Sequence, residues 1–508
     1  MPTRVLVIGL DAAEATLLER WAAEGELPAF ARLAARGGLA RLGNSLETLP
    51  GAIWPELTTG ISGGRLGLFY HPRQLHTGET GLRRIEPEEV DASLYYWTRA
   101  AAEGKRVAAF DQPQTVLTPR LNGVMLTEWG LHDRNFAIAS EPPEVLDEIR
   151  SRWGDHPVVS CDDHGGTRAG FDRLLDGLLA GAERKTELLL DFLEREHWDL
   201  FAATFGETHC VGHQFWHFFD PAQPGHDPDA PSHLRDAVKT VYRRVDQGVG
   251  ALVDAAGPET TVFVAASHGM GTYIGGYQLL PEFLVRLGLG SGSGTTAQVR
   301  TRLPAPVKSL LRRVFPGRMR HSLQEKAGSL PRPLESPHTR AVDLPNNRCG
   351  AVRLNLKGRE PHGNVEPGEE AEAILDEIRR ELYELEDPES GERIVARAVT
   401  AEEAFGSVRH PDVPDLMVVF RTDIGQITAC RSDRVGLLRA GTYNPYTPRS
   451  GDHTVESRLW AVGPAIEGGK RLPDGNVLDL APTVLDLLGV APPDDLDGRP
   501  WTVLPTRA

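Results

Sequence analysis

The sequence predicts an α/β protein built on a mainly parallel sheet with helices on both of its faces. Short apolar runs rich in β-branched residues alternate along the chain with longer amphipathic stretches. Strands that alternate with helices of this length indicate parallel strands joined by crossover helices. The chain has 508 residues, of which 40% are hydrophobic, so it can bury a large core and has room for more than one domain.

Polar residues follow several of the predicted strands. The elements are, in chain order, strand 4–10, helix 14–37, strand 106–112, helix 175–199, strand 200–206, helix 241–259 and strand 260–267. Asp11 follows the first strand, the segment 205–213 begins as another ends, and SHGMG, residues 267–271, follows the last. Loops at the carboxyl ends of parallel strands form the binding crevice in such sheets. We therefore expect these polar groups to converge on one edge.

The composition limits the possible functions. The net charge of −16 and the pI near 5.6 argue against a general nucleic-acid binder, since phosphate contacts need a basic surface. The cysteines are far apart and form no CxxC pair, which indicates neither a disulfide framework nor a Cys-based zinc finger; they are Cys161, Cys210, Cys349 and Cys430. Because the apolar runs are too short for a membrane span or a standard export signal, we expect a soluble, cytoplasmic protein.

One segment, residues 287–340, interrupts the α/β pattern. It is first rich in Gly and Ser and then strongly basic, which predicts a flexible linker followed by an inserted basic helix. Its cations include Arg300, Arg302, Lys308, Arg312, Arg313, Arg318 and Arg320. The helix is either a solvated surface element, a cap over an anionic substrate, or a contact with an acidic membrane surface through residues 300–320.

The segment FGETHCVGHQFWHFFDP, residues 205–221, suggests a metal site. His209 and His213 are four residues apart, so they share one face of a helix, and this spacing suits two imidazoles on one metal ion. The alternative is a histidine-rich core helix. His217 continues the same face, and we interpret it as a packing residue or as a residue that supports the metal ligands from behind.

Three further groups at the ends of predicted strands add to this site. Asp11 is either a helix N-cap or a ligand. Ser267 and His268 end the strand 260–267, and the glycines after them let the backbone turn closely around a ligand. Asp452 and His453 lie in a polar loop before another apolar strand.

The order of these motifs resembles the alkaline phosphatase superfamily, in particular its type I phosphodiesterase and nucleotide pyrophosphatase branch. The stretches that carry the resemblance are VLVIGLDA, TLPGAIWPELTTGISGG, GETHCVGHQFWH, SHGMG, LNLKGREPHG, GDHTVESRLWAVGPAI and VLDLAPTVLDLLGVAPPDDLDGRPW. They cover nearly the whole chain apart from the basic insert. The resemblance implies a doubly wound, alkaline-phosphatase-like core formed by residues 1–286 and 341–508.

The resemblance also implies a site for two divalent metals about 4 Å apart. Asp11 would be the metal ligand of the first strand. His213 and His453 would hold one metal and His268 the other. Thr48, in TLP ahead of Trp54, is the best match to the Thr or Ser nucleophile of the family, although the match needs two extra residues before that tryptophan.

The chain departs from the family pattern at two ligands. His209 stands where the family has an aspartate, and Ser267 stands where it has the aspartate of Asp-His-Gly. Both changes remove negative charge, so we expect one firm site and one weaker site. The firm site is the set of three imidazoles, which suits zinc; its residues are His209, His213 and His453. The weaker site contains Asp11 and His268 with Ser267 or Thr48.

These features predict a metal-dependent hydrolase of phosphodiesters, phosphomonoesters or a related anionic ester. A hydroxide at the three-histidine metal is the alternative nucleophile to Thr48. Arg73, Lys357 and Arg359 are candidates for binding a small anionic substrate. The alternatives are a degenerate family member that binds without hydrolysing, and a group-transfer enzyme on the same fold.

Overall fold

The computed structural model describes residues 4–69, 73–75, 82–131, 136–223, 225–290, 338–344, 348–440, 449–464, 466 and 468–501. The chain forms two compact units. The first contains Met1–Leu66, Ile85–Tyr273 and Pro448–Ala508, and the second contains Gly67–Arg84 and Ile274–Thr447. Most of the expected basic insert, residues 291–337, lies outside the described residues, as does the proposed membrane contact at 300–320.

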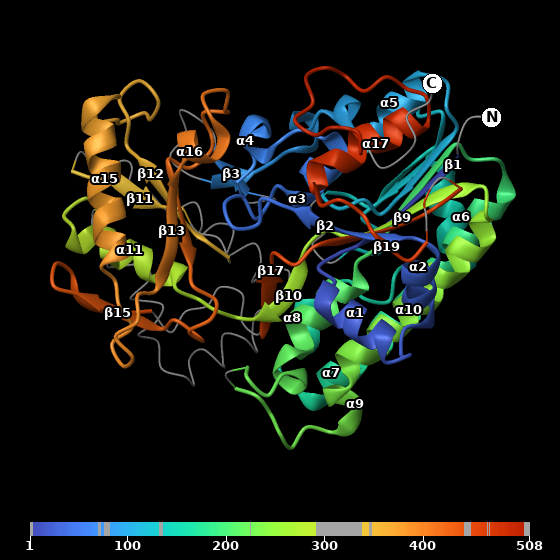
Figure 1. Ribbon diagram of the computed structural model, residues 1–508, viewed down its shortest axis with the longest axis horizontal. Helices are drawn as coiled ribbons and strands as arrows, with labels where there is room; N and C mark the ends of the chain where they lie inside the picture. Colours follow the sequence, from blue (N-terminus) through green and yellow to red (C-terminus); the bar gives the residue numbers. More distant parts are fainter. Residues whose placement is uncertain are drawn as a thin grey trace. The chain divides into compact units, whose positions relative to one another are not determined.

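The first unit is built on a large sheet whose central strands are parallel (Figure 1). Its order is β19-β2-β18-β9-β1-β8-β5-β6-β7, and β18 and β7 run antiparallel to their neighbours β9 and β6. The bounds are β1 (Arg4–Leu10), β2 (Gly38–Gly43), β5 (Val107–Phe110), β6 (Gly123–Thr127), β7 (Ala139–Glu141), β8 (Leu200–Phe205), β9 (Thr260–Ala266), β18 (Arg458–Val462) and β19 (Lys470–Arg471). The predicted mainly parallel α/β fold is confirmed.

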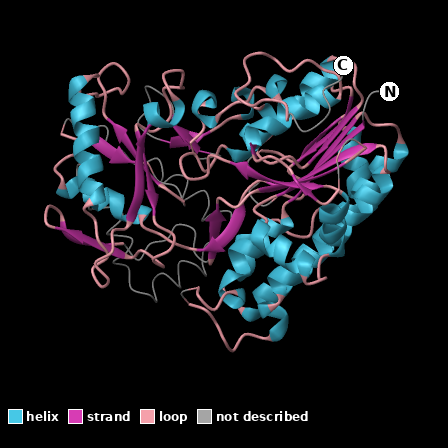
Figure 2. Cartoon of the chain, viewed as in Figure 1, coloured by secondary structure: helices cyan, strands magenta, loops and turns pink. Residues whose placement is uncertain are grey.

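Helices cover both faces of this sheet (Figures 1 and 2). Leu6 and Ile8 of β1 join one buried apolar cluster, whereas Val5 and Val7 join the other, because successive side chains of a strand point to opposite faces. The first cluster includes α1 (Ala15–Ala23), α2 (Pro28–Arg36), α7 (Arg168–Arg195), α8 (Glu207–Phe219) and α10 (Ala237–Ala256). The second includes α3 (Ile53–Thr59), α5 (Tyr96–Ala102) and α17 (Leu480–Leu487).

The helix expected over residues 14–37 is two helices, α1 and α2. Gly25 has a φ of 80°, a left-handed conformation that glycine adopts without steric cost. Pro28 then occupies the first position of α2, where its fixed φ and missing N–H favour a helix start. The chain therefore turns between two apolar faces that both pack on the same sheet.

The second unit contains a four-stranded antiparallel sheet with the order β11-β12-β14-β13. Its strands are β11 (Ala341–Asp343), β12 (Gly350–Leu354), β14 (Leu416–Phe420) and β13 (Val395–Thr400). Helix α15 (Glu369–Tyr383) buries Ala371, Ile374, Ile378 and Leu382, a spacing of three to four residues that places them on one helix face. Two hairpins, β3 (Arg73–Leu75) with β4 (Leu82–Arg84) and β15 (Ala429–Ser432) with β16 (Gly436–Arg439), complete the described strands of this unit.

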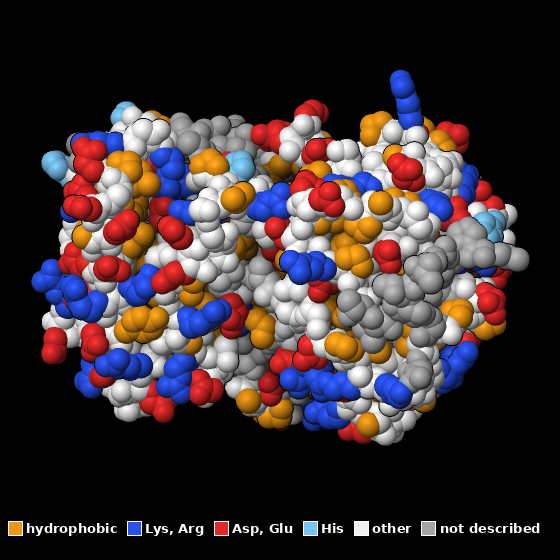
Figure 3. Space-filling model, turned by 45° about the horizontal axis from the view of Figure 1, so that its top comes forward, with side chains coloured by type: hydrophobic (Ala, Val, Ile, Leu, Met, Phe, Trp, Pro, Cys, Tyr) orange, Lys and Arg blue, Asp and Glu red, His pale blue; other side chains and the backbone are white. Residues whose placement is uncertain are grey.

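Charged side chains of both signs are interspersed on the face shown in Figure 3, where Lys and Arg lie among Asp and Glu. Within the described ranges, no helix combines the length and apolar character needed to cross a membrane.

Candidate metal centre

Three histidines of the first unit turn their Nε2 atoms toward a common point. His209 and His213 lie one turn apart on α8, which begins directly after β8, and His453 lies on β17 (Gly451–Thr454). The Nε2 atom of His453 is 3.2 Å from that of His209 and 3.0 Å from that of His213. Three nitrogens bound to one tetrahedral zinc at about 2.0–2.1 Å lie roughly 3.3 Å from one another. The histidine cluster therefore has nearly the dimensions of a metal site.

The other ring nitrogens fix the orientation of two of these imidazoles. His213 Nδ1 donates to the carbonyl oxygen of Gly451 at 2.8 Å, and His209 Nδ1 lies 2.6 Å from Asp11 Oδ2. A carbonyl or an ionised carboxylate can only accept, so the proton lies on Nδ1 and the Nε2 lone pair is left for a metal. The Nδ1 contacts thus orient two imidazoles with their Nε2 atoms toward the common point.

Glycines allow α8 to approach the two-stranded sheet that carries His453 (Figure 1). In this sheet, β17 pairs antiparallel with β10 (Gly269–Thr272). A Cβ atom at Gly212, between His209 and His213, would lie 2.6 Å from Met270 Cγ, and a Cβ atom at Gly451 would lie 2.3 Å from the oxygen of Gly212. Only residues without a Cβ fit at this contact.

Asp11 ends β1 and is buried beside these histidines. Its Oδ2 bonds His209, its Oδ1 accepts from Trp54 Nε1 at 2.8 Å, and His268 Nε2 lies 3.9 Å from Oδ1. Burial by itself would raise the pKa of Asp11, but the charge and hydrogen bond of His209, with smaller contributions from His268 and Trp54, lower the pKa to about 2. Asp11 is therefore an ionised carboxylate that lies between His209 and His268.

His268 has the chemistry of a ligand for a second cation. It follows β9, and its Nδ1 lies 3.0 Å from Ser267 Oγ. Its Nε2 is buried and has no hydrogen-bond partner among the described residues. Burial lowers the pKa of His268 to about 4, although Asp11 acts in the opposite direction. A buried ring nitrogen without a partner beside a carboxylate is an arrangement that a cation would satisfy.

Thr48 lies in a half-buried turn of the first unit, and its Oγ1 donates to the oxygen of Ser45 at 3.2 Å. Asn44, in the same loop, donates to the oxygens of Ser267 at 3.2 Å and Val455 at 3.1 Å. The loop that contains Thr48 is thereby attached to the strand end that precedes His268.

The carboxyl group of Glu56 forms a hydrogen bond with this loop. Its buried carboxyl accepts from Ser45 Oγ at 2.7 Å and from the Gly63 amide at 2.8 Å. Burial raises the pKa of Glu56 to about 7, although both hydrogen bonds act to lower it. At pH 6 the folded protein therefore holds a proton that an unfolded chain has released.

We expect the unfolding free energy to fall as the pH rises from about 5 to 8. In this range the folded state binds the proton of Glu56 more tightly than the unfolded chain does, so removing protons from solution destabilises the folded state. Glu56→Gln, which resembles the protonated carboxyl, should reduce that fall by up to about 3 kcal/mol. Urea unfolding of both proteins across this pH range measures the difference. Parallel profiles would show that Glu56 does not titrate in this window.

Asp452, Glu207 and His217 lie near the cluster but bond to other groups. Asp452 Oδ1 accepts from the backbone amide of His453 at 2.8 Å. Glu207 lies 3.2 Å from His156 and 3.8 Å from Lys185, in a buried ionic network. His217 Nδ1 lies 2.9 Å from Ser450 Oγ, and burial lowers the pKa of His217 to about 4.

The candidate substrate-binding cations belong to the second unit. Arg73 begins β3, and its side chain is outside the description. Lys357 is exposed and forms an ion pair with Glu366. The Arg359 guanidinium lies 2.7 Å from both carboxylate oxygens of Asp415 and 2.8 Å from Glu360. A substrate contact by Arg359 would have to compete with these two carboxylates.

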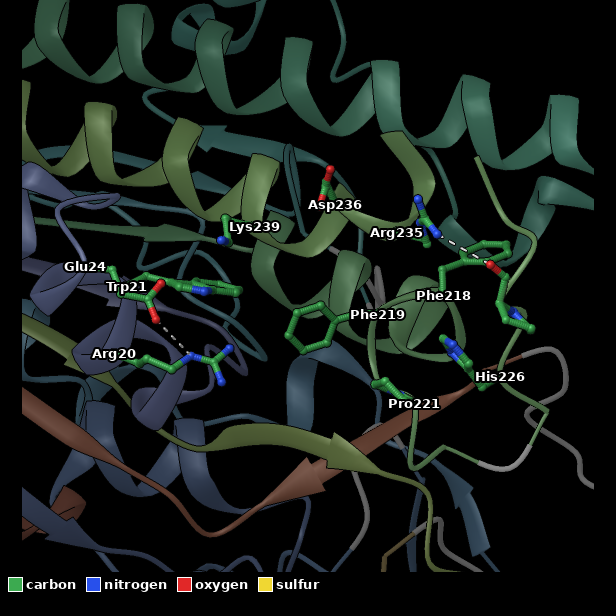
Figure 4. Close-up of a pocket in the computed structure, with 11 residues that line it drawn as sticks. Arg20, Trp21, Glu24, Phe218, Phe219, Pro221, His226, Arg235, Asp236 and Lys239 are labelled. Atoms are coloured by element: carbon green, nitrogen blue, oxygen red, sulfur yellow. Dashed lines mark hydrogen bonds and ion pairs between the residues drawn. The ribbon is translucent and has the colours of Figure 1, made fainter. Parts of the chain in front are cut away.

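A cavity of about 500 Å³ lies near the far end of α8 (Figure 4). Trp21 and Phe219, whose rings pack edge to face, line it together with ions of both signs. Arg20 is 3.9 Å from Glu24, and Lys239 is 3.9 Å from Glu26. None of the residues that we expect in the metal centre lines this cavity.

Comparisons with known proteins identify similar chains. A family model described as type I phosphodiesterase / nucleotide pyrophosphatase matches residues 5–434. No curated protein matches the chain in sequence. The fold is similar to that of phosphonoacetate hydrolase from Sinorhizobium meliloti 1021 in complex with phosphonoformate, with a TM-score of 0.53, 12% identity, and 96% of each chain covered. Murine ectonucleotide pyrophosphatase/phosphodiesterase 5 in complex with AMP covers 97% of this chain and 96% of its own, with 12% identity and a TM-score of 0.46.

Proposed function

The chain belongs to the type I phosphodiesterase and nucleotide pyrophosphatase family, and on that premise we propose that it is a metal-dependent hydrolase of phosphodiesters, phosphomonoesters or a related anionic ester. The resemblance seen in the sequence is thereby confirmed. The observation that carries the proposal is the convergence of His209, His213 and His453, whose ligand atoms lie within 4.8 Å of one another. Neutral imidazoles with fixed Nδ1 partners gather in this way around a divalent cation.

Zinc is the metal that we propose for the three-histidine site. Zinc at such a site acts as a Lewis acid and lowers the pKa of a bound water to about 7. Asp11 orients His209, and the Gly451 carbonyl orients His213. The weaker second site would be formed by Asp11 and His268, with Ser267 or Thr48 as a further oxygen ligand.

Thr48 is our proposed nucleophile. A covalent intermediate on this hydroxyl would divide one difficult displacement into two easier steps. Its position in the chain, ahead of Trp54, favours this role, and the attachment of its loop to Ser267 through Asn44 supports it. Direct attack by a water from the three-histidine site is the competing route.

A second candidate function follows from the two departures at the ligands. His209 and Ser267 replace two carboxylates of the resembling family, which reduces the negative charge available to two dications. A family member with one metal could bind its ligand without hydrolysis, or transfer a group to an acceptor other than water.

We propose that the substrate is a small anion and that Arg73, Lys357 and Arg359 take part in its binding. A cytoplasmic location is also part of this proposal, since the cysteines are free and buried. The contact of residues 300–320 with an acidic membrane remains a prediction from sequence.

The proposal is tested by metal analysis of the purified protein together with a screen of generic phosphate and sulfate esters. We expect close to one equivalent of tightly held zinc, a second equivalent that is removed by mild chelation, and hydrolysis of at least one phosphate ester. Activity should be lost with a strong chelator and return with zinc. A protein that binds zinc but hydrolyses none of the esters would favour the binding function, whereas a protein that binds no divalent metal would contradict the proposal.

A further inference from the structure

Glu14 is a buried carboxylate that contacts the metal centre only indirectly. It lies between β1, which ends at Leu10, and α1, which begins at Ala15, and its side chain caps that helix. Its exposed fraction is 6%. Burial of a carboxylate this deeply destabilises the folded state unless its oxygens accept hydrogen bonds.

The hydrogen bonds of one oxygen, Glu14 Oε2, go to the two-stranded sheet β10/β17, which carries His453. Oε2 accepts from the backbone amide of Met270 at 3.1 Å and from Thr454 Oγ1 at 2.7 Å. Met270 is paired with His453 in this sheet, and Thr454 is paired with Gly269. The carboxylate therefore bonds both strands next to His453 on one side and His268 on the other.

The other polar groups of Glu14 bond to helices and not to this two-stranded sheet. Oε1 accepts from Thr16 Oγ1 at 2.6 Å and from the Thr16 amide at 3.3 Å. The Glu14 amide donates to the hydroxyl of Tyr242 on α10 at 2.8 Å. The carboxylate thus connects the start of α1 to a two-stranded sheet that continues the pairing of β9 with β18.

Gly269 in SHGMG is explained by this contact. A Cβ atom at position 269 would lie 2.2 Å from Glu14 Oε2 and 2.3 Å from Thr454 Oγ1. Without a side chain at this position, the carboxylate can approach both strands.

We propose that Glu14 is a positioning residue that sets how closely the two-stranded sheet β10/β17 approaches α8, and so aligns His453 and His268 for metal binding. The inference rests on the proposed metal-dependent function. His453 Nε2 lies 3.0–3.2 Å from the Nε2 atoms on α8, so a shift of this sheet by about 1 Å would disturb the ligand geometry. Groups that orient metal ligands from behind typically contribute about 10- to 100-fold in metal affinity.

The test compares zinc affinity in matched variants of the full chain, by competition with a chromophoric chelator. Thr454→Val keeps the side-chain shape but removes one hydrogen bond between Glu14 and the sheet β10/β17, and Glu14→Ala removes both. We expect zinc affinity to fall in both variants, by about 10- to 100-fold in Glu14→Ala. Thr16→Val is the matched control, because it removes a hydrogen bond of the same carboxylate on the side away from this sheet, and its affinity should be unchanged.

Glu14→Gln separates geometry from charge. The amide oxygen can still accept from Met270 and Thr454, while the amide nitrogen can donate to Thr16 Oγ1, so this variant should recover most of the affinity. If Glu14→Ala does not fold, Thr454→Val and Glu14→Gln carry the test. Unchanged zinc affinity in Thr454→Val, or a loss in Glu14→Gln as large as that in Glu14→Ala, would overturn the inference. A wild-type chain that binds no zinc would instead overturn the proposed function.

Discussion

Replacing His213 with Ala is expected to lower bound zinc to well below one equivalent and to abolish hydrolysis. His213 is almost fully buried, and the bond of its Nδ1 to Gly451 fixes the orientation of its ring. An alanine at this position offers no atom that could replace Nε2 as a metal ligand. With only two imidazoles left, the site would lack the three nitrogen ligands that bind zinc firmly. Metal analysis after gel filtration measures the stoichiometry, and a generic phosphate ester measures the rate.

His217→Gln provides the matched control for this prediction. His217 lies on the same helix one turn further on, but its Nδ1 bonds Ser450. The control should retain metal and activity, while circular dichroism shows that both variants fold. Retention of metal and activity in His213→Ala would mean that α8 is only a packed core helix.

Replacing Thr48 with Ala is expected to reduce turnover by several orders of magnitude while zinc remains bound. Loss of a nucleophile removes the covalent route altogether, whereas loss of a residue that only lines the site costs about tenfold or less. Thr48→Ser keeps a hydroxyl at the same position and should recover a large part of the rate. Steady-state turnover of the three proteins, at matched zinc content, gives the comparison.

The opposite result has a clear meaning. If Thr48→Ala turns over at a near-normal rate with zinc bound, the attacking group is a water from the three-histidine site. The loop around Asn44 would then have a structural role, through its bonds to Ser267 and Val455.

The sequence was sufficient to predict four central strands of the large sheet, β1, β5, β8 and β9. β1, β8 and β9 are continuous buried apolar runs, and such runs between long amphipathic helices are typical of parallel strands covered on both faces. The histidine cluster could be anticipated because His209 and His213 have helical spacing and the resemblance pointed to His453. The structure brings these three side chains together.

Other parts of the site depend on contacts between distant residues and left no local pattern. The bond between Asp11 and Trp54, the approach of Gly451 to Gly212, and the contact of Glu14 with Thr454 each join segments far apart in the chain. In the sequence alone, a glycine or glutamate at such a position cannot be distinguished from an ordinary loop or helix residue. The antiparallel sheet of the second unit was also missed, because several of its strands are short and their partners are remote in sequence.

The proposed function depends most on the identity of the zinc ligands. X-ray absorption spectroscopy of the protein loaded with a single equivalent of zinc tests it directly. We predict three imidazole nitrogens at about 2.0–2.1 Å with one further light atom, and one imidazole fewer in His453→Ala. A first coordination shell made mainly of carboxylate oxygens, or a spectrum unchanged in His453→Ala, would contradict the three-histidine site.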